Sequence, residues 1–89
     1  MTDVINEIID QAISALVNDS PEKSAESLEE LAHVFARGGQ PLQSFLNMRT
    51  YIITQASEQT SALFIQEKVK VQEQILREKR NASRKIIIH

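Results

Sequence analysis

The sequence has no cysteine and no tryptophan, and only two glycines and two prolines among its 89 residues. The absence of cysteine excludes a disulfide framework and thiolate chemistry. So few glycines and prolines cannot supply the turns of a β-rich protein. Aromatic residues are equally scarce, and comprise only Phe35, Phe45, Tyr51 and Phe64. Because a chain this short buries only a small core, its stability must come from ordinary packing or from a second subunit.

Long apolar runs are also missing from the sequence. No run approaches the roughly 20 residues that a membrane-spanning helix requires. Met1 is followed by Thr2 and Asp3 rather than by a basic segment and an apolar core, so no secretory leader is expected. We therefore expect a single cytoplasmic domain over residues 1–89, with no membrane span.

Apolar residues recur at helical spacing through most of the sequence, and this pattern predicts an all-α fold. The first helix is expected over about residues 4–17. The second is expected over about residues 21–37, because Ser20 suits the N-cap position and Pro21 suits the first helical position. Gly38 is expected to close this helix in the left-handed conformation.

The third helix begins at about Pro41, and no glycine or proline follows it in the sequence. We predict that it continues unbroken over about residues 41–84, followed by a tail over 85–89. At 1.5 Å per residue it would be about 65 Å long, so the two short helices could not cover it. A break near residues 57–61, where serine and threonine lower the helix propensity, would instead give a compact four-helix bundle. The favoured fold is a short helical hairpin packed on a long third helix, in a small bundle completed by oligomerisation.

The second half of this long helix would leave an apolar stripe in water. Each large apolar side chain left exposed costs about 1.5–3 kcal/mol, so the stripe favours a homodimer in which it pairs with a partner helix as a coiled coil. The three consecutive isoleucines of the tail favour a strand and do not share one helix face. They could dock on the core, pair with another chain or be disordered, and we expect an oligomer or a partner to bury them. The predicted interface consists of Leu63, Phe64, Val71, Ile75, Ile86, Ile87 and Ile88.

The charges are unevenly placed, although the net charge is only −2. Residues 1–30 carry eight carboxylates and one lysine, a net −7, whereas residues 68–89 carry seven cations and two carboxylates, a net +5. The basic end permits two interpretations: attraction to the acidic helices of the bundle, or contact with a polyanion such as nucleic acid. The lack of interleaved aromatic residues favours the first. The candidate polyanion contacts are Arg77, Lys79, Arg80, Arg84 and Lys85.

Catalytic motifs are not found in the sequence. Glu30 and His33 have the Glu-x-x-His spacing of helical di-iron sites, but the second copy of the motif is absent, so we expect no metal or other cofactor. No serine lies in a nucleophile-elbow motif, and we expect no enzymatic activity. The sequence therefore predicts a protein–protein interaction module: a small adaptor, chaperone, assembly factor or regulator that acts through amphipathic helix faces. The alternative is a small dimeric nucleic-acid-binding regulator that uses the basic residues of segment 77–85.

Overall fold

Four helices make up the part of the chain described by the computed structural model, which covers the backbone of residues 2–88 and the side chains of residues 3–81. These helices are α1 (Thr2–Val17), α2 (Pro21–Arg37), α3 (Leu42–Gln59) and α4 (Ala62–Ile88). Over residues 2–88 there is no strand, and the predicted all-α class is confirmed.

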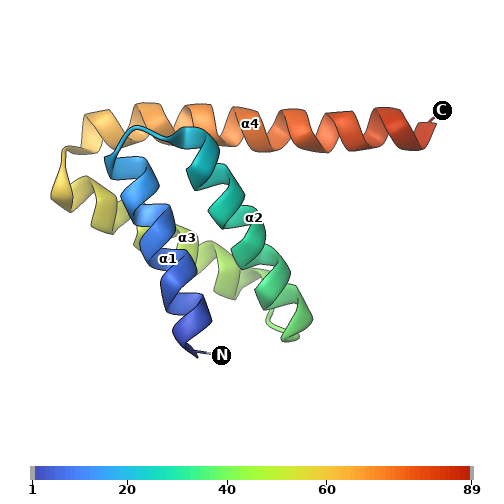
Figure 1. Ribbon diagram of the computed structural model, residues 1–89, viewed down its shortest axis with the longest axis horizontal. Helices are drawn as coiled ribbons and strands as arrows, with labels where there is room; N and C mark the ends of the chain where they lie inside the picture. Colours follow the sequence, from blue (N-terminus) through green and yellow to red (C-terminus); the bar gives the residue numbers. More distant parts are fainter. Residues whose placement is uncertain (1, 89) are drawn as a thin grey trace.

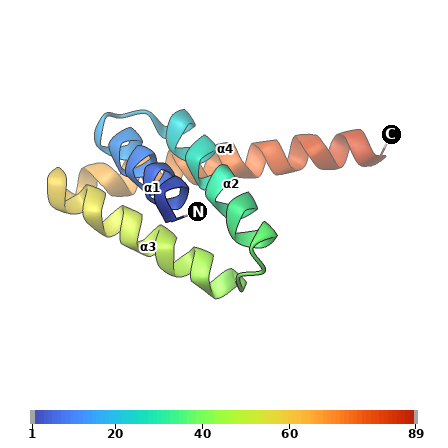
Figure 2. The same ribbon diagram turned by 60° about the horizontal axis from the view of Figure 1, so that its bottom comes forward.

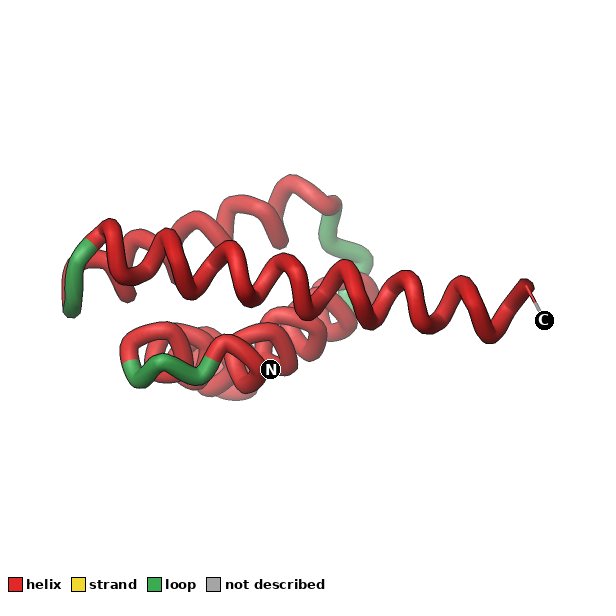
Figure 3. Tube along the Cα trace, turned by 90° about the horizontal axis from the view of Figure 1, so that it is seen from above, coloured by secondary structure: helices red, strands yellow, loops and turns green. Residues whose placement is uncertain are grey.

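The helices form a small bundle from which one end of α4 projects. α1 and α2 form a hairpin, and α4 runs across one end of it before continuing beyond the other helices (Figure 1). α3 and α4 are close together at the corner that connects them, and the distance between them increases away from it (Figures 1 and 2). Figure 3 shows α4 in front, with α3 to one side of it and the α1–α2 hairpin to the other. The described residues measure 44 × 29 × 19 Å along their principal axes.

All four helices contribute side chains to one core. α1 contributes a wide apolar stripe because buried positions recur every three or four residues along it. Burying each large aliphatic side chain contributes about 1.5–3 kcal/mol. The most deeply buried large apolar residues are Leu16 of α1, Leu31 of α2, Ile52 of α3 and Ile65 of α4.

The starts of α2 and α3 follow their prolines. α2 begins at Pro21, as predicted, although the side chain of Ser20 makes no hydrogen bond at the N-cap. Pro41 was expected as the first helical residue, but it is the N-cap of α3, with an extended backbone (φ −68°, ψ 155°). α1 begins at Thr2, two residues earlier than the pattern predicted.

The end of α2 differs in one residue from the prediction. Gly38 has φ −81°, and Gly39 is the residue in the left-handed region, with φ 72°. The backbone N–H of Gln40 donates to the carbonyl of Phe35 at 3.0 Å, which is the long bond of a Schellman motif. Asp19, with φ 58°, has the equivalent position after α1.

The prediction of an unbroken third helix is wrong, because α3 ends at Gln59 and α4 begins at Ala62. Two hydroxyl side chains provide the caps that glycine or proline would otherwise supply. Thr60 donates its backbone N–H and its Oγ1 hydroxyl to the Ala56 carbonyl, at 3.2 and 3.1 Å. The Oγ atom of Ser61 accepts the backbone N–H of Phe64 at 3.2 Å, which caps the start of α4.

The chain reversal has an energetic reason. It returns α4 to the bundle, where Ile65 becomes fully buried instead of lying on a projecting helix.

A second difference from the prediction concerns residues 85–88, which were expected to form a separate tail. The backbone of α4 continues through them to Ile88.

A polar pair lies inside the bundle where α4 crosses α2. Ser24 and Gln72 are both fully buried, and the Ser24 hydroxyl donates to Oε1 of Gln72. The Nε2 group of Gln72 has no hydrogen-bond partner among the described residues. A buried donor without a partner is unfavourable, so the unpartnered Nε2 group weakens the docking of α4. The hydrogen bond between Ser24 and Gln72 favours one register of α4 on α2.

The corner can be tested with two serine variants. Ser61→Ala removes the hydroxyl that caps α4, so we expect the free energy of unfolding to fall by about 1 kcal/mol in urea titrations followed by circular dichroism. Ser57→Ala is the control, because the Ser57 hydroxyl donates to the Ile53 carbonyl within α3. We expect it to change stability by less than about 0.5 kcal/mol. Equal losses in the two variants would contradict a capping role for Ser61.

The buried polar pair generates a second prediction. Ser24→Ala leaves both polar ends of the Gln72 amide buried without a partner, so it should lower the free energy of unfolding by about 1–3 kcal/mol. Adding Gln72→Met replaces the amide with an apolar chain of similar length. The double variant should therefore be at least as stable as the original protein. Thermal and urea unfolding measure both effects, and a double variant as unstable as Ser24→Ala would contradict this account.

Candidate partner-binding surfaces

The predicted interface residues of α4 divide between two directions around the helix. At about 100° per residue, Phe64, Val71 and Ile75 fall within about 40° of one another, whereas Leu63 points elsewhere. Val71 is 43% exposed, and Phe64 and Ile75 are half-buried. We call these three residues the α4 stripe. Leu63 is 78% exposed and stands apart from the stripe.

The remaining residues of the predicted interface are Ile86, Ile87 and Ile88. Their backbone belongs to α4, but their side chains lie outside the described residues. The α4 stripe itself is partly covered from within the chain. The Lys68 ammonium lies 4.9 Å from the centre of the Phe64 ring, a cation–π contact.

Part of the basic end is engaged by the acidic part of the same chain. Lys79 contacts Glu29 of α2 at 2.8 Å, and Lys68 contacts Asp19, in the turn between α1 and α2, also at 2.8 Å. The hydrogen bond that the Lys79 ammonium donates to the Glu29 carboxylate raises the pKa of Lys79 above its ordinary value. At high pH the pair is lost as the pH rises through that elevated pKa, because Lys79 then loses its charge.

Arg77 and Arg80 differ from Lys79. Both are exposed, and neither takes part in the three ion pairs formed among the described residues. The other two residues of the predicted basic cluster, Arg84 and Lys85, have side chains outside the described part of the chain. Among the described residues of α4, the exposed cations outside these ion pairs are Lys70, Arg77 and Arg80, and only the two arginines belong to the predicted basic cluster.

A groove that the sequence did not reveal lies between α2, α3 and α4. Its two adjoining parts have volumes of about 360 and 440 Å³ and share Leu28, Phe45, Leu76 and Arg80. We call it the arginine groove. Its complete lining is Leu28, Glu29, Ala32, His33, Leu42, Phe45, Leu46, Arg49, Glu73, Leu76, Arg77, Lys79 and Arg80.

The arginine groove exists because α3 and α4 diverge from their corner (Figure 2). Nearer the corner, Arg49 of α3 forms an ion pair with Glu73 of α4. Further out, Leu42 is 72% exposed and Leu46 is 37% exposed on the α3 side. The groove therefore combines an apolar lining with a cationic edge.

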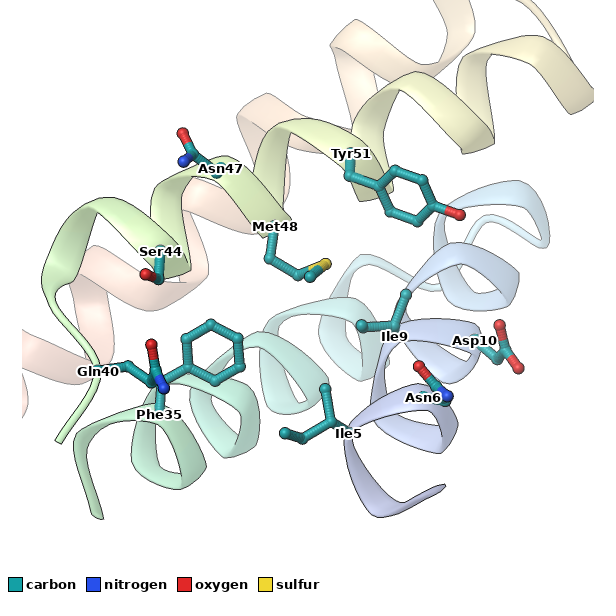
Figure 4. Close-up of a pocket in the computed structure, with 10 residues that line it drawn as sticks. All are labelled: Ile5, Asn6, Ile9, Asp10, Phe35, Gln40, Ser44, Asn47, Met48 and Tyr51. Carbon is teal, nitrogen blue, oxygen red and sulfur yellow. The ribbon is translucent and has the colours of Figure 1, made fainter. Parts of the chain in front are cut away.

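A second and larger groove of about 860 Å³ lies between α1 and α3 (Figure 4). Ile5 and Ile9 of α1 and Met48 of α3 point into it, while Tyr51 extends along one side. Its polar lining is mostly uncharged and consists of Asn6, Asp10, Gln40, Ser44, Asn47 and the Tyr51 hydroxyl. With a single carboxylate and no cation, this groove shows little selectivity for the charge of a ligand.

The candidate metal motif of α2 is on the surface. Glu30 and His33 are both exposed, and His33 lines one end of the arginine groove. Over the described residues, no three His, Cys, Asp or Glu side chains gather in an arrangement that could hold a metal ion.

None of the helices, within the same residues, is both long and apolar enough to cross a membrane.

Comparison with known proteins found no matching family, no similar curated protein and no similar solved structure. The surfaces themselves therefore supply the basis for a functional proposal. Sequence reasoning identified Arg77 and Arg80 but missed their proximity to Phe45 and Leu42, because an unbroken third helix would separate these residues. The only available signal was the apolar spacing of Leu42, Phe45 and Leu46.

Proposed function

We propose that the protein is a non-enzymatic protein–protein interaction module, such as a small cytoplasmic adaptor, assembly factor, chaperone or regulator. The observation that carries this proposal is the arginine groove, an apolar surface open to solvent and edged by charge. Leu42, at 72% exposed, lies on its margin. Apolar surfaces bordered by polar residues are typical of sites that bind proteins.

Association into a homodimer through α4 is the second part of the proposal. Val71 is 43% exposed, and with Phe64 and Ile75 it forms the α4 stripe. A twofold axis beside α4 would bring two copies of this stripe together, because a symmetric dimer uses the same patch of each subunit. Both helices would then bury side chains that water now contacts.

A nucleic-acid-binding regulator is the second candidate, and the exposure of Arg77 and Arg80 favours it. Two observations argue against this second candidate. Lys79 is already paired with Glu29. The arginines also lie beside an apolar lining, which phosphate contacts do not use.

The homodimer can be tested by analytical ultracentrifugation at about 100 μM, a concentration that populates a complex with a micromolar dissociation constant. The original protein should sediment as a dimer and Val71→Glu as a monomer, because the charge would be buried without a partner. Val4→Glu is the matched control. Val4 is 49% exposed on α1, away from the stripe, so this variant should remain dimeric.

A folded, monomeric original protein at this concentration would contradict the homodimer. Circular dichroism of both variants establishes that the helices are retained. This outcome would leave the arginine groove unaffected, since the groove is formed within one chain.

A further inference from the structure

We propose that the arginine groove binds an acidic amphipathic helix from another protein. This inference rests on the proposed interaction function and specifies the chemistry of the partner. It concerns a surface of one chain that is separate from the α4 stripe.

The apolar lining provides sites for the anchor residues of such a helix. Leu28 is buried beneath the groove, while Phe45 and Leu76 are half-buried and still line it. Leu42 and Leu46 extend the apolar surface along α3. An amphipathic helix presents anchors at i, i+3 or i+4, and i+7, which suit a groove between two helices.

The architecture also favours a helix as the occupant. α3 and α4 form the sides of the groove and diverge away from the Thr60–Ser61 corner, while α2 contributes Leu28 (Figures 1 and 2). Helices pack by inserting the side chains of one between those of its neighbours. A partner helix placed here would contact the apolar faces of both diverging helices, as an added member of the bundle.

The charges select an acidic partner. Arg49 and Lys79 also line the groove, but Glu73 and Glu29 already pair with them. The exposed guanidinium groups of Arg77 and Arg80 are three residues apart, and neither takes part in the ion pairs formed within the described residues. Carboxylates flanking the anchors of a partner helix could form charge-assisted, bidentate hydrogen bonds with these two arginines.

A second copy of this chain is a poor occupant. Its exposed acidic helix faces are on α1, with Asp3, Glu7 and Asp10, and on α2, with Glu22, Glu26 and Glu30. Among the described residues of these two helices, Val4 is the only exposed large apolar residue. Both faces lack the repeated anchors that the groove would accept. Nucleic acid is also disfavoured, because the groove has one phenylalanine, the half-buried Phe45, and His33 at one end, rather than a series of aromatic side chains on which successive bases could stack.

The probe is a fluorescein-labelled synthetic helix of about 14 residues, or four turns, with leucine on one face and glutamate on both flanks. A second peptide replaces every glutamate with glutamine. Fluorescence anisotropy titrations use the full chain at low salt. We expect the glutamate peptide to bind at least about tenfold more tightly than the glutamine peptide, and its advantage to shrink as salt is added.

Two pairs of variants locate the binding. Leu42→Ser and the double variant Arg77→Gln/Arg80→Gln should each weaken binding of the glutamate peptide about threefold to tenfold. Leu63→Ser is the apolar control, because Leu63 is as exposed as Leu42 but lies outside the groove. Lys23→Gln is the charge control, since Lys23 is exposed near the start of α2. Both controls should bind within about twofold of the original protein.

Three outcomes would overturn the inference: no binding of the glutamate peptide, equal binding of the two peptides, or binding that Leu42→Ser and the arginine variant leave unchanged. Preferential binding of a labelled DNA duplex, lost in the arginine variant, would overturn it in favour of nucleic acid. Absence of peptide binding by a protein that sediments as a dimer would reject the acidic partner and retain the homodimer. Peptide binding by a monomer would support the inference and reject only the homodimer.

Discussion

The reversal of the chain at Thr60 and Ser61 is the constraint on which the rest of the structure depends. It places α4 across the end of the α1–α2 hairpin, where Ile65 joins the core. It also leaves α3 and α4 side by side near the corner and separated further out, which creates the arginine groove. Two hydroxyl side chains thus cap the helices at the corner on which both the packing of the bundle and the location of its candidate binding surface depend.

The ion pairs of α4 contribute to its position on the other helices more than to the free energy of its packing. Lys68 and Lys79 meet Asp19 and Glu29 at exposed or partly exposed positions, where such pairs contribute little to stability. Together with the buried contact to Gln72, they favour one register of α4 on α2. The same pairing neutralises part of the basic end, whereas Arg77 and Arg80 take no part in the ion pairs formed among the described residues.

The local features of the fold were more predictable than the arrangement of its helices. Pro21 and the Gly38–Gly39 pair identified α2 closely, because proline and glycine restrict the backbone directly. The corner after Gln59 was less predictable because serine and threonine can either cap a helix or remain within one. An unbroken helix would place Leu42 and Arg80 about 57 Å apart along its axis, so the groove could not be inferred from that prediction. The sequence identified the two arginines as candidate contact residues. It could not identify their apolar neighbours, because the chain reversal brings these neighbours close to them.

The burial pattern of α4 has a consequence for the motions of the protein. Among its described side chains only Ile65 and Gln72 are buried, and Gln72 carries an amide group without a partner. α4 should therefore separate from the other helices at a lower free energy than global unfolding, so that its amide hydrogens exchange with solvent before those of α1. The arginine groove forms only in the state in which α4 is packed on the other helices. A partner that binds there would draw the equilibrium toward that state and slow exchange along α4, far beyond the residues it contacts.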